Sequence, residues 1–136
     1  MRNIILASTL MLLAMPAAAQ NVSVGEGDWS NIPALKKNRV VQLSPDSQSM
    51  IDRIALEDKC KALGRSGRIN LAMPFLVEFT ADNAVASILV KRIGCPDVES
   101  IAANTALRAA QSGKIKPDGD NAAGWYQGEV SYTLQY

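Results

Sequence analysis

The segment at residues 69–79 alternates in hydrophobicity, and this pattern constrains the fold more than any other feature of the chain. Every odd position in it is apolar, whereas polar residues interrupt the other face: the apolar set is Ile69, Leu71, Met73, Phe75, Val77 and Phe79. A repeat of two is typical of a β-strand with one buried face. Pro74 lacks an N–H, so we expect the strand to lie at a sheet edge or to bulge there.

Two further segments are predicted to be strands of the same sheet. Residues 85–93 follow a polar turn at 81–84, in which Asn83 tolerates a positive φ, so they are expected to form the antiparallel partner of the first strand. Residues 125–136 alternate in the same way up to the last residue. This final segment is predicted to be a half-buried antiparallel strand.

Two helices are predicted from their end signals and apolar faces. Ser44, Pro45 and Asp46 are typical of a helix start, and Gly64 is a suitable residue to end that helix. The second helix is expected to begin at Pro96 and to end at Gly113. A face of small and branched residues, rich in alanine, suits close packing of this helix on a sheet.

The order of these elements predicts an α+β domain. Helix, strand, strand, helix and strand follow one another, so we expect two helices on one face of a three-stranded antiparallel sheet (α-β-β-α-β). The domain is expected to cover residues 44–136. Residues 20–43 are rich in turn formers and are predicted to be an extended N-terminal arm, with a short strand or extended segment at 39–43.

The first 19 residues have the three parts of a secretory signal peptide. Arg2 supplies the positive start, an apolar core follows, and Pro16 precedes the small residues at 17–19, which suit cleavage before Gln20. An uncleaved anchor is the alternative, but the core is shorter than the roughly 20 apolar residues that cross a bilayer. We therefore expect export to the periplasm, or secretion.

The chain has two cysteines, Cys60 and Cys95. In an oxidising compartment an even number favours a disulfide, whereas a redox-active dithiol usually has the Cys-x-x-Cys spacing that is absent here. We expect a structural bridge, with Cys60 late in the first helix and Cys95 where a strand leads into the second. Such a bridge helps a small domain that buries limited apolar area.

Charge and composition exclude several classes of function. Without Arg2 the chain has 13 basic and 13 acidic residues, so no basic surface indicates binding to nucleic acid or to an anionic membrane. We also expect no membrane insertion once the signal peptide is cleaved. There is no histidine, which excludes Ser-His-Asp and Cys-His catalysis. The carboxylates Glu57, Asp58, Asp118 and Asp120 are expected to be solvated, and a weak calcium site at Asp118–Asn121 lacks the EF-hand spacing. We expect no catalytic residue, no metal site and no cofactor.

Residues from about 67 to 134 resemble the C-terminal domain of the TonB family and, more distantly, the related TolA domain. The resemblance is carried by "FLVEFTADNAV", in the place of the family's hairpin, by "ILVKRIGCPDVESIAANTALRAAQSGKIKP", with the junction Gly-Cys-Pro, and by "WYQGEVSYTL" as the last strand. Family members also carry a membrane anchor and a Pro-rich linker. This chain has a signal peptide instead, so we expect a module without its own anchor.

The resemblance implies a periplasmic protein-binding module. Family members bind segments of outer-membrane transporters by adding a peptide strand to a sheet edge, a mode that relies on main-chain hydrogen bonds. We expect the last strand to offer that edge, through Gln127, Glu129, Ser131 and Thr133, with Glu129 guarding against indiscriminate pairing. The alternative is that residues 39–43 cover the edge. A TolA-like soluble factor for envelope integrity is the second function, and dimerisation by strand exchange stays open.

Overall fold

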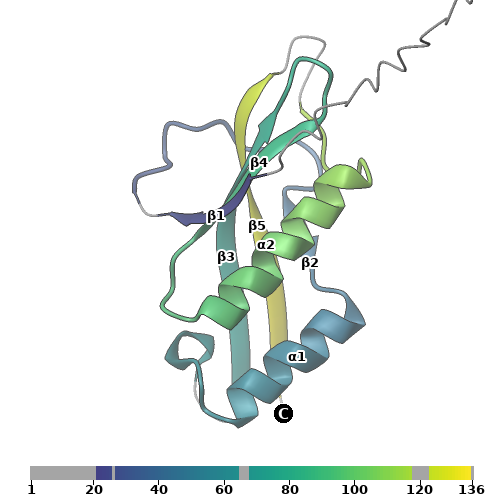
Figure 1. Cartoon of the computed structure of the whole chain (residues 1–136). Helices are drawn as coiled ribbons and strands as arrows, with labels where there is room; N and C mark the ends of the chain where they lie inside the picture. Colours follow the sequence, from purple (N-terminus) through teal and green to yellow (C-terminus); the bar gives the residue numbers. More distant parts are fainter. Residues whose placement is uncertain (1–20, 26, 65–67, 118–122, 136) are drawn as a thin grey trace, which may run out of the picture.

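The computed structural model describes residues 21–25, 27–64, 68–117 and 123–135. Eight elements follow one another in these ranges (Figure 1): β1 (Asn21–Gly25), β2 (Val40–Gln42), α1 (Pro45–Leu56), the 3₁₀ turn η1 (Lys61–Leu63), β3 (Arg68–Phe79), β4 (Val85–Lys91), α2 (Pro96–Gln111) and β5 (Gly124–Gln135). The predicted signal peptide, residues 1–19, lies outside the described residues.

The strands form one mixed sheet in the order β1-β4-β3-β5-β2. β3 is central and runs antiparallel to both β4 and β5. The two outer strands come from the N-terminal arm: β1 pairs parallel with β4, and β2 pairs parallel with β5. The prediction of a three-stranded antiparallel sheet in an α-β-β-α-β chain is therefore wrong, because two more strands precede the first helix.

β1 escaped prediction, and β2 was not counted in the predicted sheet, because neither has a long alternating pattern. β1 spans 5 residues and ends at Gly25, in a segment whose glycines and Asp28 indicate turns. β2 has 3 residues, within the segment 39–43 that is expected to be a short strand or extended segment and, in the alternative arrangement, to cover the edge of the last strand. Both gain their strand conformation from pairing with β4 and β5, a long-range effect that local propensity does not show.

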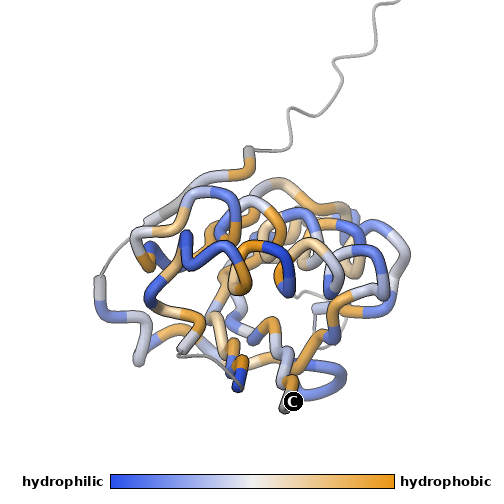
Figure 2. The backbone as a smooth tube through the Cα atoms, turned by 90° about the horizontal axis from the view of Figure 1, so that it is seen from below, coloured by the Kyte–Doolittle hydropathy of each residue, from blue (hydrophilic) through white to orange (hydrophobic). Residues whose placement is uncertain are grey.

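Both helices lie over the same face of the sheet (Figure 1). The odd residues of β3, from Ile69 to Phe79, are buried beneath them together with Val130 and Tyr132 of β5. α1 is held to β5 by a hydrogen bond of 2.7 Å that the Tyr132 hydroxyl donates to Asp52 Oδ1. Seen from below, hydrophobic and hydrophilic residues alternate along the backbone, as expected for elements with one buried face (Figure 2).

The first helix ends earlier than predicted. α1 stops at Leu56, and Asp58 takes a left-handed conformation with φ 52°. Gly64 instead ends η1, and Cys60 precedes that turn. The charged run after Leu56 has no apolar side chain to bury, which explains why the helix stops before the glycine.

Other local predictions are confirmed. Asn83 has φ 61° in the turn between β3 and β4, and α2 begins at Pro96 and is followed by Gly113 with φ 75°. The expectation for Pro74 is wrong: it lies inside the central strand, in register with Glu129 of β5, and the register shift of the β3–β4 ladder falls between Glu78 and Phe79. Glu129 directs its N–H to Arg39 O and away from β3, so the missing N–H of Pro74 removes no hydrogen bond to β5.

Candidate functional site

The predicted binding edge on β5 is occupied by the N-terminal arm. The backbone groups of Gln127 and Glu129 face outward, and their N–H groups donate to Pro33 O at 2.9 Å and to Arg39 O at 2.7 Å. The N–H of Leu35 donates to Gln127 O at 2.9 Å. Of the other predicted edge residues, Ser131 pairs with Gln42, whereas Thr133 lies beyond the last residue paired with β2. The structure thus shows the second of the two arrangements considered for this edge.

The arm reaches β5 by crossing the face of the sheet opposite the helices. Gln127 projects from that face, and its side-chain amide donates to Trp29 O at 3.3 Å and to Ile32 O at 2.6 Å. Trp29 is buried, and the ammonium group of Lys91 in β4 lies 5.6 Å from the centre of its ring. These contacts fix the segment between β1 and β2 to β5 through Gln127 and to β4 through Lys91.

The opposite edge of the sheet is formed by β1. Gly25 O accepts a hydrogen bond from Arg92 N, so the odd residues of β1 direct their backbone groups to β4. The backbone N–H and C=O groups of Val22 and Val24 therefore face away from the sheet. The side chain of Val22 is 42% exposed, and no charged residue or proline interrupts the strand. Native proteins usually protect an edge strand with a charged residue, a proline or a covering segment, and β1 has neither of the first two.

Sequence reasoning missed the edge at β1. The signal that identifies it is the short alternation Asn-Val-Ser-Val, which is too brief to stand out beside the turn formers that follow.

The expected disulfide joins Cys60 to Cys95, with 5.7 Å between the Cα atoms. Cys60 precedes η1 and Cys95 is the N-cap of α2, so the bridge ties the end of the α1 region to the start of α2. Beside it, the buried Glu99 accepts a hydrogen bond of 3.0 Å from Cys95 N through Oε2. The pair thus belongs to the core and holds the two helical segments together.

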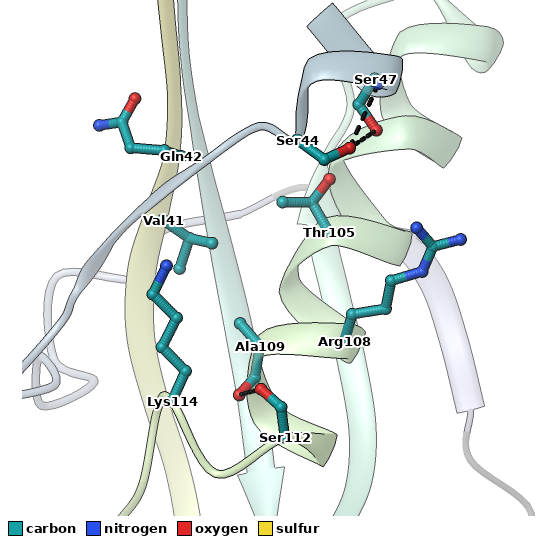
Figure 3. A pocket seen from close by; sticks show the side chains of 9 residues that line it. All are labelled: Val41, Gln42, Ser44, Ser47, Thr105, Arg108, Ala109, Ser112 and Lys114. Carbon is teal, nitrogen blue, oxygen red and sulfur yellow. Dashed lines mark hydrogen bonds between the residues drawn. The ribbon is translucent and has the colours of Figure 1, made fainter.

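A cavity of about 260 Å³ opens between β2, the start of α1 and the end of α2 (Figure 3). Its lining combines two cationic side chains, four hydroxyl groups and no carboxylate: Val41, Gln42, Ser44, Ser47, Thr105, Arg108, Ala109, Ser112 and Lys114. Lys114 and Arg108 lie on opposite sides of Ala109, with Ser44, Ser47 and Thr105 at the far end (Figure 3).

The carboxylates considered for chemistry are not gathered into a site. Glu57 is ion-paired with Lys59 at 2.6 Å on the surface, and this contact lowers the pKa of Glu57 and raises the pKa of Lys59. Asp118 and Asp120 lie outside the described residues. Among the residues that the structure describes, no three side chains of the metal-binding types cluster. Within the same ranges, no helix has both the length and the apolar character needed to span a bilayer.

Comparison of the chain with protein-family models, with curated proteins and with solved structures finds no match in any of the three.

Proposed function

We propose that this protein is a protein-binding module of the cell envelope, which engages its partner by β-strand addition at the outer edge of β1. The observation that carries the proposal is the open edge itself. Within the described ranges no strand lies beside the outward N–H and C=O groups of Val22 and Val24, and the strand itself carries no guarding charge. A peptide in extended conformation can satisfy these groups with main-chain hydrogen bonds.

Support for an edge at β1, and not at β5, comes from the path of the N-terminal arm. The arm already fills the hydrogen-bonding positions of β5 from Gln127 to Ser131. A partner there would have to displace β2 and the segment anchored by Trp29, whereas β1 is the outermost strand and, among the described residues, has no strand on its outer side. Beyond β2, the end of β5 around Thr133 offers a further stretch of edge.

The resemblance to the TonB C-terminal domain supports the class of partner. It suggests an extended segment of an envelope protein, for example of a TonB-dependent outer-membrane transporter. The expected signal peptide would place the protein in the periplasm, where such segments are accessible. The same resemblance supports a binding role over an enzymatic one.

Site-specific photocrosslinking tests the proposal. A photoreactive amino acid replaces Val22, Thr133 or the exposed Ser100 in three separate proteins, which are incubated with solubilised envelope proteins. We expect a defined adduct, identified by mass spectrometry, from position 22 alone. The variant Val22→Pro removes one outward N–H but leaves the ladder to β4 intact, so it should abolish co-purification of that partner, whereas Thr133→Pro should not.

Three outcomes would count against the proposal. Adducts from position 133 but not from position 22 would place binding at β5, and equal capture from all three positions would indicate non-specific contact. Retention of the partner by Val22→Pro would show that main-chain pairing at β1 is not used.

The TolA-like role in envelope integrity is the second candidate, and it rests on the same resemblance. Deletion of the gene separates the two. Loss of transporter-dependent uptake without detergent sensitivity favours a TonB-like role, and detergent sensitivity with normal uptake favours the TolA-like role.

A further inference from the structure

Two short basic segments meet beside β2, at the edge of the sheet that lies farthest from β1. One segment belongs to the N-terminal arm and the other follows α2. The side-chain amide of Asn38 donates a hydrogen bond of 3.0 Å to Lys114 O, which ties the two segments together. Lys114 also lines the same hollow as Val41 of β2 (Figure 3). We refer to the five exposed cations of these segments as the basic edge: Lys36, Lys37, Arg39, Lys114 and Lys116.

Buried neighbours hold the cations of the basic edge at the surface. Leu35 and Val41 are buried and enclose the arm segment, whereas the buried Ile115 separates Lys114 from Lys116. The N–H of Lys114 donates to Ala109 O at 2.9 Å, so the second segment is fixed to the end of α2. The fold therefore sets the positions of both segments before any ligand binds.

The two segments do not neutralise their own charge. Residues 36–41 and 108–117 contain no carboxylate. Within the described ranges, four of the five cations form no ion pair: Lys37, Arg39, Lys114 and Lys116. Glu129 of β5, in register with Val40, contributes one negative charge beside them. The balanced charge of the whole chain gives no indication of this surface, because the segments that meet at Asn38 and Lys114 are 76 positions apart.

We propose that the basic edge holds the protein on an anionic lipid surface, as a peripheral contact without insertion. Cations spread over two segments suit a surface that carries many separate charges, since each lysine or arginine near the lipid adds to the attraction. Val40, whose side chain is 43% exposed, adds an apolar contact at the same place. Neither segment has an aromatic side chain on which nucleic-acid bases could stack, which favours lipid headgroups as the partner.

The order of the strands makes this contact compatible with partner binding at β1. β2 and β1 are the two outermost strands of the sheet and lie on opposite sides of it (Figure 1). Four strand spacings of about 4.8 Å separate them by about 19 Å. This distance exceeds the Debye length of about 8 Å at physiological salt, so a protein bound through the basic edge presents β1 away from the lipid. The lipid contact does not depend on strand addition at β1, so either can hold without the other.

Co-sedimentation of the full-length secreted protein with lipid vesicles tests the proposal. Vesicles of equal parts of phosphatidylglycerol and phosphatidylcholine are compared with vesicles of phosphatidylcholine alone, in about 0.1 M and about 1 M salt. We expect binding to the anionic vesicles alone, and its loss at high salt. The double variant Lys37→Gln/Lys116→Gln should weaken this binding about 25-fold, since each basic residue near the surface contributes about fivefold. The matched control, Lys61→Gln/Arg68→Gln, removes two exposed cations outside the basic edge and should bind like the wild type.

A paramagnetic headgroup in anionic bicelles tests the orientation by NMR. The amide signals of Arg39 and Lys114 should broaden, whereas those of Val22 and Val24 should keep their intensity. Equal binding to both kinds of vesicle, or an equal loss of binding in the two double variants, would overturn the proposal. Broadening centred on Val22 would place the lipid at the wrong edge. Tighter binding to a short DNA duplex than to anionic vesicles in the same salt would identify nucleic acid, and not lipid, as the partner.

Discussion

The disulfide between Cys60 and Cys95 should contribute a large share of the stability of this domain. The proposed perturbation is the double variant Cys60→Ala/Cys95→Ala, which removes the cross-link but keeps small apolar side chains at two buried positions. The bridge closes a loop with a sequence separation of 35 residues. In the chain-entropy model, closing a loop of this length raises the free energy of the unfolded state by about 3.8 kcal/mol at 25 °C.

Urea unfolding followed by circular dichroism measures this contribution. We expect the free energy of unfolding of the variant to fall by about 3–5 kcal/mol relative to the oxidised protein, a large fraction of the roughly 5–15 kcal/mol typical of small domains. The wild-type protein reduced with a phosphine is the matched control, because it keeps both sulfur atoms in the core. It should lose nearly as much stability as the variant.

A loss below about 1 kcal/mol in both proteins would refute this reasoning, because the chain-entropy model predicts several times as much. A mass spectrum of the secreted protein should also be two hydrogens lighter than that of the reduced form. Two free thiols in the secreted protein would remove the bridge from the account altogether.

Three further predictions concern the sheet and its surroundings. Gly128→Ala should destabilise the protein by about 1–3 kcal/mol in urea unfolding, since the new Cβ would lie 2.5 Å from Phe75 Cζ in a packed core; a neutral result would contradict the packing. Tyr132→Phe should cost about 1–2 kcal/mol through the lost hydrogen bond to Asp52, and a second change, Asp52→Asn, should then have little additional effect. The backbone N–H of Ser30 donates a hydrogen bond to Asp28 Oδ1 and lowers the pKa of Asp28. This hydrogen bond therefore stabilises the fold above the ordinary aspartate pKa, and its contribution is lost as the pH falls through the lower pKa of the folded state. An NMR titration midpoint of Asp28 at or above the ordinary aspartate pKa would contradict this.

The parts of the fold that could be predicted are those with strong local signals. The period-two pattern that ends at Phe79 and the Pro96 and Gly113 signals of α2 identify their elements because burial and capping act within a few residues. The turn at Asn83 follows from a single residue that tolerates a positive φ. The pairing of Cys60 with Cys95 follows from their number in a chain expected to be exported.

The parts that could not be predicted depend on contacts between distant segments. β1 and β2 exist as strands because β4 and β5 supply their hydrogen-bond partners, and Arg39 and Glu129, which share one of these bonds, are far apart in the sequence. The same long-range pairing decides which sheet edge is open. The alternation in β5 separates the two faces of the strand, but it contains no information on which segment pairs with Gln127. The cavity escaped prediction for the same reason, since two distant stretches of the chain, 41–47 and 105–114, supply its lining.

Backbone amide hydrogen exchange, followed by NMR, tests most directly which edge of the sheet is open. If the N-terminal arm closes β5 and leaves β1 as the outer edge, the amides of Gln127 and Glu129 are protected, while those of Val22 and Val24 exchange rapidly until a partner strand is added. Rapid exchange at Gln127 and Glu129, with protection at Val22 and Val24 in the isolated protein, would contradict this arrangement.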